Sequence, residues 1–337
     1  MNLSDYPAID HPVPPVVQTP GRRPGTVSLS VVAPCYNEST VLHEFHQRMT
    51  AACRSLGSDY EIILVNDGSC DETWEILLDL ASRDAQLVCI SLSRNHGHQL
   101  ALTAGLRYCR GEHIFIIDAD LQDPPELLGA MVALADKGAD VVYGKRRKRA
   151  GESAFKKLTA HVFYRVLNTL TDRQIPKDTG DFRLISRRVL EVINSMPENH
   201  RFMRGMISWA GFRQVPILYD RSPRFAGGTK YTVRKMVDFA IDAITSFSVK
   251  PLRLAFYTAF LLSLLSLLLL AYSIFAYFVF NTIRGWTSIM AVMLFFLSAQ
   301  FLFLGLIGEY VGRMYLEVKQ RPLFIVQDVV YGKCPEQ

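Results

Sequence analysis

The chain has 337 residues and a formal net charge of +5; 49% of its residues are hydrophobic and 20% are charged. This combination indicates a soluble part joined to a membrane part. The modest positive charge gives no reason to expect a nucleic-acid partner, and it fits a protein that lies against an anionic membrane face. The six cysteines show no C-x-x-C spacing and are expected to be reduced structural thiols. Residues 1–26 are rich in proline and lack the apolar run of a signal peptide, so we expect a disordered or extended lead-in.

Short apolar runs alternate with amphipathic stretches between residues 27 and 145. Such alternation predicts a parallel sheet covered by crossover helices. The expected elements are strand 27–37, helix 39–57, strand 60–69, helix 71–84, strand 87–93, helix 96–109, strand 112–120, helix 124–138 and strand 139–144.

Polar residues follow these predicted strands where each strand ends. In parallel sheets, ligands bind beyond the carboxyl ends of the strands. We therefore expect four groups to surround a ligand: Asn37 with Glu38, Asp67 with Gly68, Arg94 with Asn95, and Asp118 with Asp120.

The stretch "FIIDADLQDPPELL", residues 115–128, carries the strongest local signal for chemistry. Carboxylates at the end of a buried strand are costly unless a positive charge sits beside them. Oxygen ligands of this kind suit Mg²⁺ or Mn²⁺, which predicts a metal at Asp118 and Asp120. Successive strand residues point to opposite faces, so the chain must turn at Ala119 for both acids to face one site. The alternative is helix capping by Asp120 or Asp123, which would account for one acid but hardly for all three.

Asp67, in "VNDGSCDET", is by itself typical of an Asp-Gly turn. Its strand is expected one strand over from the acid pair, so a second role is open, in which Asp67 accepts hydrogen bonds from a nucleobase or ribose.

Beyond Gly144 the pattern loosens into helix 155–170, a strand running into a helix at 179–188, helix 201–211 and strand 212–221. In "YDRSPRFAGGTKY", cations flank a Gly-Gly pair, which suits closure of a loop over phosphate oxygens. A solvated loop attracted to anionic lipid is the alternative, and it is our interpretation of the basic run at 145–149.

The C-terminal third predicts membrane association. Residues 231–248 space their apolar side chains at helical intervals, which indicates an interfacial helix. Two uncharged runs, 254–280 and 286–308, are each long enough to span a bilayer. Cations flank the outer ends of this hairpin, whereas its loop carries only Arg284, so both ends and the large N-terminal region are expected in the cytoplasm.

Six motifs in chain order, "VVAPCYNE", "VNDGSCDET", "RNHGHQLALTAG", "DADLQDPP", "DTGDFRL" and "RFAGGTKY", resemble the polyprenyl-phosphate glycosyltransferases of glycosyltransferase family 2. The resemblance covers nearly the whole chain after Val27 and is greatest to the bactoprenol glucosyltransferase branch. It implies a GT-A α/β domain with a mostly parallel sheet at 27–230, an interfacial amphipathic helix at 231–250, two transmembrane helices within 251–308 and a cytoplasmic segment at 309–337.

The resemblance also implies roles for particular residues. It places the nucleotide at Pro34, Tyr36, Glu38, Asp67 and Asp118, and Mg²⁺ or Mn²⁺ at Asp118, Asp120 and Gln122. It gives catalytic positions to Asp181 and Arg204, and acceptor-phosphate contacts to Arg183, Arg221, Arg224 and Lys230. Many relatives have G-x-S-K-Y where this chain has Gly228, Thr229 and Lys230, which leaves the detail of donor or acceptor contacts open.

The implied reaction transfers a hexose, with glucose as the first candidate, from a UDP-sugar to undecaprenyl phosphate at the cytoplasmic face of a bacterial inner membrane. The lipid phosphate attacks the anomeric carbon from the face opposite the leaving UDP, which inverts it. This phosphate is already anionic at neutral pH, so Asp181 is expected mainly to orient the acceptor, and its action as a general base is expected to be secondary. Relatives of this kind suggest a homotetramer.

Several alternatives remain at this stage. The donor could instead be GDP-mannose, a UDP-N-acetylhexosamine or a modified pentose, because a few hydrogen bonds to hydroxyls decide selectivity. A processive polysaccharide synthase would need more spans and a Q-x-x-R-W signature, whereas the matching region reads "GMISWAG". A non-catalytic scaffold that binds nucleotide sugars would have lost its catalytic groups, but Asp118, Asp181 and Arg204 are intact.

Overall fold

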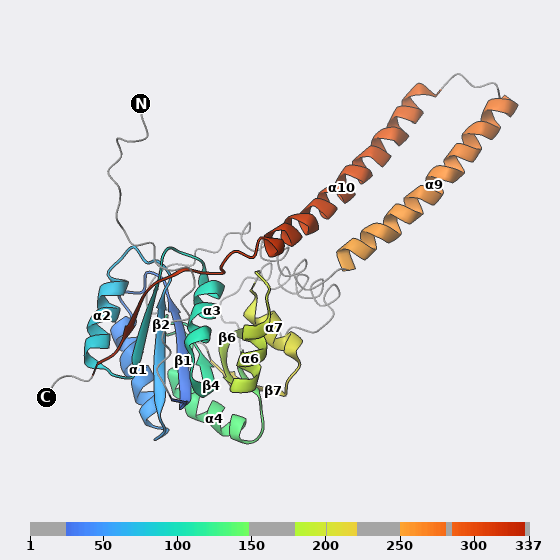
Figure 1. Ribbon diagram of the computed structural model, residues 1–337. Coiled ribbons are helices and arrows are strands. Elements are labelled where there is room, and N and C mark those ends of the chain that lie inside the picture. The colour runs from blue at the N-terminus through green and yellow to red at the C-terminus, as the bar shows by residue number, and fades with distance from the viewer. Residues whose placement is uncertain (1–24, 148–178, 200, 221–249, 281–284, 334–337) are drawn as a thin grey trace, which may run out of the picture.

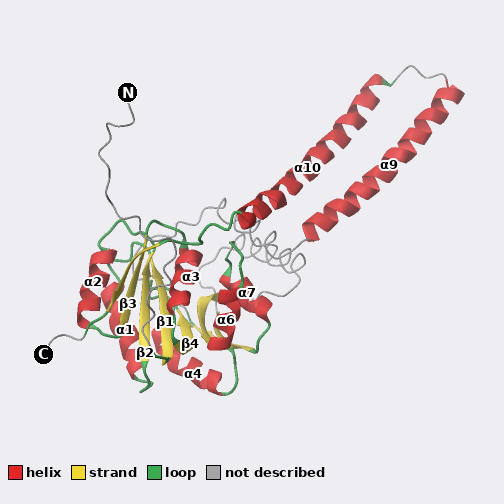
Figure 2. Ribbon diagram, in the orientation of Figure 1, coloured by secondary structure: helices red, strands yellow, loops and turns green. Residues whose placement is uncertain are grey.

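A computed structural model describes residues 25–147, 179–199, 201–220, 250–280 and 285–333. Within these ranges an α/β domain carries a pair of long helices that project away from it (Figures 1 and 2). The strands are β1 Val27–Cys35, β2 Tyr60–Asn66, β3 Leu87–Leu92, β4 Gly111–Ile116, β5 Val141–Arg146, β6 Thr179–Ser186, β7 Gln214–Tyr219 and β8 Val326–Tyr331. The helices are α1 Leu42–Arg54, α2 Thr73–Arg83, α3 His98–Tyr108, α4 Leu128–Asp136, α6 Arg187–Ser195, α7 Met203–Ala210, α9 Lys250–Phe280 and α10 Trp286–Val318, with a 3₁₀ turn, η2, at Pro125–Leu127.

The described strands form one eight-stranded sheet in the order β7-β5-β6-β4-β1-β2-β3-β8. Its centre is parallel, because β1 pairs with β2 and β4 in the same direction and β2 pairs likewise with β3. The predicted mostly parallel α/β fold of the GT-A type is therefore confirmed. Two strands run against this direction: β6 lies antiparallel between β4 and β5, and β8 lies antiparallel along β3.

The sheet is buried on both faces, which explains why its central strands read as continuous apolar runs. One core layer packs Ala33 and its neighbours against α1, α2 and α4 through side chains such as Phe45 and Leu77. The other packs Val32 against α3, α6 and α7 through side chains such as Leu102. Successive side chains along each strand therefore point into two separate cores, one on each face of the sheet.

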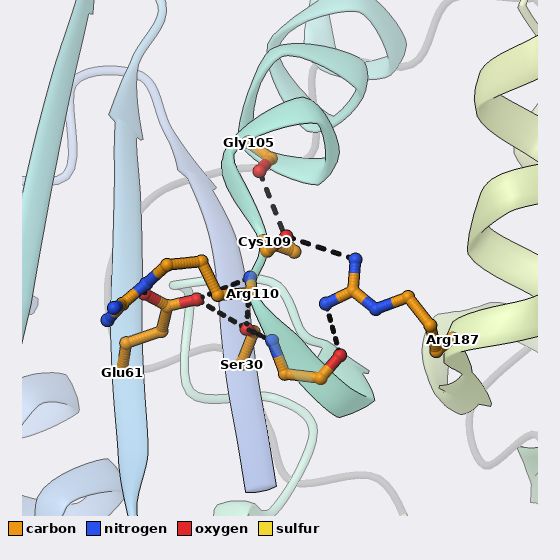
Figure 3. A network of polar contacts seen from close by, with 7 residues as sticks. Ser30, Glu61, Gly105, Cys109, Arg110 and Arg187 are labelled. Carbon is orange, nitrogen blue, oxygen red and sulfur yellow. Dashed lines mark hydrogen bonds and ion pairs between the residues drawn. The ribbon is translucent and has the colours of Figure 1, made fainter. Parts of the chain in front are cut away.

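A buried polar network fixes the end of the sheet where β1, β2 and β4 begin (Figure 3). Glu61 is only 2% exposed, and its carboxylate accepts hydrogen bonds from the Ser30 hydroxyl at 2.6 Å and from Arg110 Nε at 2.7 Å. The backbone N–H of Arg110 donates to the same carboxylate at 2.7 Å. On the other side of this turn, Arg187 of α6 donates to the carbonyls of Cys109 and Gly111. The network joins α3, β4 and α6 at the edge of the domain opposite the strand ends that carry the site.

The C-terminal part contains the two long helices and then returns to the sheet. Helix α10 continues to Val318, ten residues past the predicted end of the second span at Gly308, and the chain then adds β8 to the edge strand β3. The sequence analysis did not predict this strand. Across the described ranges, one stretch, Phe295–Val318, is long and apolar enough to cross a membrane. The predicted interfacial helix at 231–250 and the lead-in at 1–26 lie almost entirely outside the described residues.

Candidate active site

A pocket of about 220 Å³ opens at the carboxyl ends of β1, β2 and β4. Most of its lining residues lie at the ends of strands or just after them, as the strand-end pattern predicted. The lining consists of Pro34, Cys35, Tyr36, Glu38, Asp67, Asn95, Gly97, His98, Asp118, Ala119 and Asp120. All five residues expected around a nucleotide, Pro34, Tyr36, Glu38, Asp67 and Asp118, are among them.

The two acids of the Asp118–Asp120 pair reach the same pocket because the chain turns between them. Strand β4 ends at Ile116, residues 119 and 120 form a turn, and Leu121 takes a left-handed conformation with φ of 56°. The backbone N–H of Gln122 donates to Asp120 Oδ1 at 3.1 Å and so holds this carboxylate in place. The turn at Ala119 that the metal hypothesis required is present. The Gln122 side chain is not among the residues that line the pocket.

Capping does not account for these acids. Neither η2 nor α4, the elements that follow, has a side-chain hydrogen bond at its N-terminus. Asp123, which is 1% exposed, instead accepts a hydrogen bond of 2.5 Å from the Tyr219 hydroxyl of β7. Asp123 therefore ties the acidic turn to the far edge strand.

The charge in the pocket fits a bound divalent cation. Burial raises the pKa of Asp118 to about 6, with the nearby carboxylates of Asp181, Asp123 and Asp120 adding to this effect and His98 opposing it. Ionised acids crowded in this way are stabilised by a cation. No cluster of three or more His, Cys, Asp or Glu side chains suited to a metal occurs in the described part of the chain. The arrangement matches Mg²⁺ or Mn²⁺ sites, which use one or two carboxylates and take further oxygens from substrate phosphates.

Asp67 shapes the pocket wall through its own hydrogen bonds. Its carboxylate oxygens accept from the backbone N–H groups of His96 at 2.7 Å and Gly97 at 2.9 Å. The neighbouring Gly68 has φ of 64°, and a Cβ there would lie 2.5 Å from the backbone of Arg94 and Asn95. The Asp-Gly pair of the sequence therefore both makes a turn and brings the loop after β3 against the loop after β2.

The loop after β1 is fixed in a similar way by residues that follow β2. The N–H of Asn37 donates to the Ser69 hydroxyl, and its side-chain oxygen accepts from the N–H of Cys70. The N–H of Glu38 donates to the Thr73 hydroxyl at 3.0 Å. These hydrogen bonds between the two loops thus hold Tyr36 and Glu38 at the pocket before any ligand binds.

Asp181, on β6, lies beside this pocket among three partners from other elements. Its carboxylate is 6% exposed; Arg204 Nε lies 3.1 Å away, His98 Nε2 3.3 Å away, and Gln99 Nε2 donates at 2.8 Å. Burial alone would raise the pKa of Asp181, but Arg204, His98 and Arg183 hold it well below the ordinary value. The two residues expected to be catalytic, Asp181 and Arg204, are therefore paired.

His98 joins the two halves of the site. Its Nε2 atom lies 3.5 Å from Asp118 Oδ1, in addition to its contact with Asp181. Burial would lower the pKa of His98, but the two carboxylates raise it to about 9. His98 and Gln99 were not predicted from the sequence as site residues, although "RNHGHQ" stands between a strand and a helix, where ligand contacts are expected.

The cations expected at the acceptor phosphate are only partly described. Arg183, two residues after Asp181 on β6, is 4% exposed and donates to the Gly180 carbonyl at 2.8 Å. Burial lowers the pKa of Arg183 to about 10, with Asp181 opposing this effect. Arg221, Arg224 and Lys230 lie outside the described residues.

Comparisons with known proteins agree with this geometry. A sequence model of glycosyl transferase family 2 matches residues 30–193, and a model of the GtrB C-terminal hairpin matches residues 250–314. The chain is 46% identical to the uncharacterized glycosyltransferase YkcC of Bacillus subtilis, over 89% of this chain and 94% of that protein. It is 37% identical to the prophage bactoprenol glucosyl transferase homolog of Escherichia coli K12, over 90% and 99% of the two chains. It is also 37% identical to the bactoprenol glucosyl transferase of Shigella phage SfII, over 89% and 98%.

Proposed function

This chain belongs to glycosyltransferase family 2, and we propose that it transfers a hexose, with glucose as the first candidate, from a UDP-sugar to undecaprenyl phosphate. The names of the bactoprenol glucosyl transferases, to which it is similar along nearly their whole length, support this acceptor. The match of residues 250–314 to the GtrB C-terminal hairpin model supports a membrane-bound enzyme whose catalytic domain is followed by a helical hairpin.

The donor half of the site is proposed to be the pocket at the strand ends. Pro34, Tyr36, Glu38 and Asp67 would surround the nucleoside, and Asp118 with Asp120 would hold Mg²⁺ or Mn²⁺, with Gln122 nearby. Such an ion, when bound, supplies Lewis-acid neutralisation of charge on the diphosphate. The protein's own contribution is to hold these carboxylates in a preformed turn, so that little reorganisation is needed when the donor binds.

The acceptor half is proposed to centre on Asp181 and the cations around it. A carboxylate whose pKa is held well below the ordinary value is a weak base. This supports a role for Asp181 in orienting Arg204 and the acceptor, while Arg183, Arg221, Arg224 and Lys230 would offset the charge of the lipid phosphate. The phosphate then attacks the anomeric carbon on the side away from the departing UDP, with inversion.

One observation carries this proposal: His98 lies within 3.5 Å of Asp118 and within 3.3 Å of Asp181. Asp118 of the donor pocket and Asp181, the proposed acceptor acid, thus both lie close to the same imidazole nitrogen, Nε2. Two substrates bound to the two halves would meet at this ring, as transfer between them requires.

The proposed topology places the catalytic domain at the cytoplasmic face, with the chain crossing the inner membrane twice through α9 and α10. The return of β8 to the sheet supports an even number of crossings, because the chain before α9 and the chain after α10 belong to one domain. Cations at Lys250, Arg253, Lys319 and Arg321 support the cytoplasmic side. Assembly into a homotetramer is part of the proposal and would be measured by mass photometry in detergent.

The test is transfer of labelled sugar to undecaprenyl phosphate by the purified full chain in proteoliposomes. UDP-glucose, UDP-N-acetylglucosamine and GDP-mannose would be compared, with and without Mg²⁺ or Mn²⁺, and analysis of the anomeric linkage would report inversion. We expect UDP-glucose to give the lipid-linked product and Asp118→Asn to abolish it. Nucleotide binding without transfer from any of the donors would indicate the scaffold instead.

A further inference from the structure

The end of helix α10 contacts the catalytic domain through the side chain of Glu317. Its Oε1 atom accepts a hydrogen bond of 2.9 Å from the backbone N–H of Asn199, and its Oε2 atom accepts one of 2.8 Å from Asn199 Nδ2. Asn199 Nδ2 also lies 3.3 Å from the carbonyl of Leu316. The two residues are 118 positions apart in sequence, so this clamp joins the membrane helix to the loop between α6 and α7.

A carboxylate at this place needs an explanation. Glu317 lies one residue before the end of α10 at Val318, where the helix dipole disfavours negative charge. The hydrogen bonds from Asn199 offset this cost, and hydrogen bonds to a charged group are stronger than neutral ones. The clamp also lies at the end of the candidate span Phe295–Val318, where the membrane helix meets the domain.

The loop held by Glu317 leads directly into the catalytic cluster. Four residues after Asn199, α7 begins at Met203, whose backbone N–H donates to Gln99 Oε1 at 2.9 Å. The next residue is Arg204, which pairs with Asp181. The first turn of α7 carries Arg204, and the contact between Glu317 and Asn199 links the loop before that turn to the end of α10.

The chain that follows α10 makes a second set of contacts with the same domain. Phe324 lies under the guanidinium of Arg107 in α3, and the Ile325 carbonyl accepts from the N–H of Ser93 at the end of β3. Strand β8 then continues along β3. The junction is thus held at the loop before α7 by Glu317, and at α3 and β3 by Phe324 and Ile325.

We propose that Glu317 is a positioning residue, which, through Asn199, sets the depth of Arg204 and Asp181 relative to the membrane and hence to the lipid phosphate. This inference depends on the proposed function for its acceptor. A polyprenyl phosphate held in a bilayer has its phosphate confined to the headgroup plane, so an active site at the wrong depth reaches it less often. A short-chain acceptor free in solution has no such constraint.

The first test measures the clamp without using activity. Hydrogen–deuterium exchange of the full chain in nanodiscs would be compared for wild type, Glu317→Ala and Glu309→Gln. The control residue Glu309 pairs with Arg313 of α10 itself at 2.8 Å. We expect faster exchange of residues 201–210 in Glu317→Ala alone, with β1–β3 unchanged. Unchanged exchange of residues 201–210 in Glu317→Ala would overturn the inference, whether or not the protein transfers sugar.

The second test compares acceptors. We expect Glu317→Ala to raise the KM for undecaprenyl phosphate in proteoliposomes roughly tenfold, the scale set by one charge-assisted hydrogen bond. The kcat, the KM for the sugar nucleotide and transfer to a short-chain acceptor should stay within about twofold of wild type. Glu317→Gln, which keeps one acceptor oxygen, should be intermediate, and Asn199→Ala combined with Glu317→Ala should be no worse than Glu317→Ala. An equal loss with both acceptors, or no loss with either, would overturn the positioning role; a wild type that transfers nothing would instead refute the proposed function.

Discussion

Arg204 Nε lies 3.1 Å from Asp181 Oδ1, although the two side chains come from α7 and β6. The pair is mostly shielded from water, since Asp181 is only 6% exposed. Arg204 is the strongest of the charges that hold the pKa of Asp181 down. Arg204 therefore favours the ionised form of Asp181, and the contact holds the two side chains together.

Loss of Arg204 should therefore cost more than one contact. We expect Arg204→Ala to lower kcat by roughly 100-fold or more, the scale found when one preorganised electrostatic group is removed. Arg204→Lys should lower kcat less, because it keeps the positive charge. Some loss should remain, because lysine lacks the planar guanidinium group. Asp181→Asn combined with Arg204→Ala should be little worse than the poorer single variant, because residues that act as a unit are not additive. Initial rates of sugar transfer are the measurement.

The control for this series is Arg83→Ala, because Arg83 is exposed and pairs with Asp79 of the same helix, α2. Its kcat should stay within about twofold of wild type, as is usual for exposed surface pairs. Full activity of Arg204→Ala would contradict the role given to the pair.

Gly68→Ala should damage the donor pocket. The new Cβ would meet the backbone of Arg94 and Asn95 at a positive φ, so the loop after β3 must move. We expect weaker UDP binding by calorimetry and a loss of about 1–3 kcal/mol of stability, the usual cost of backbone strain. Gly129→Ala is the matched control: it lies in α4, and its Cβ would find Leu56 at an ordinary 3.9 Å. That variant should bind UDP normally, and equal effects of the two substitutions would contradict the packing argument.

Arg110→Ala should destabilise the protein without changing its chemistry. It leaves the buried Glu61 carboxylate without its ion-pair partner at 2.7 Å, and unpairing a buried charge typically costs about 3–5 kcal/mol. The network lies at the opposite ends of the strands from the pocket, so kcat per folded molecule at low temperature should be unchanged. Adding Glu61→Gln to Arg110→Ala should restore part of the lost melting temperature, because the uncompensated charge is removed. A melting temperature equal to that of wild type in Arg110→Ala would contradict the prediction.

The His46–Asp84 pair predicts a pH dependence of stability. Asp84 Oδ2 lies 2.9 Å from His46 Nε2, and this hydrogen bond, partly opposed by burial and aided by the N–H of Gln86, lowers the pKa of Asp84. A folded-state pKa below the unfolded value of about 3.9 means that ionised Asp84 stabilises the fold fully above roughly pH 4. That contribution is lost as the pH falls through the folded-state pKa.

Asp84→Asn should therefore melt below wild type at pH 7, by an amount that corresponds to about 1 kcal/mol. The gap should begin to narrow as the pH falls below about 4, and it should close below the folded-state pKa of Asp84, where the wild-type carboxyl is also neutral. Scanning fluorimetry of both proteins from pH 3 to 8 checks this. A gap that stays constant over the whole range would show that the charge of Asp84 contributes nothing.

Much of the fold and the donor half of the site could be predicted from the chain, because both depend on local rules. Apolar runs of strand length alternate with amphipathic stretches, and this alternation predicts a largely parallel sheet. Carboxyl ends of parallel strands share one edge, so Glu38, Asp67 and Asp118 had to converge wherever the sheet formed. The turn at Ala119 followed from a single requirement, that two acids face one metal.

The acceptor half could not be predicted in this way. The insertion of β6 antiparallel between β4 and β5 brings Asp181 to Gln99, which is 82 positions away. Such a neighbour depends on strand order and register, which leave no periodic trace in the sequence. His98 was overlooked for the same reason: its importance comes from two carboxylates that belong to β6 and to the segment after β4.

The sequence by itself determined most of the elements, the pocket edge and the apolar helices, because side-chain period and composition act over a few residues. Only the tertiary structure decided which strand lies beside which, that β8 closes the sheet after α10, and that Asn199 meets Glu317. The physical reason is that long-range contacts are selected by the packing of whole elements against a common core, so no short stretch of chain contains them.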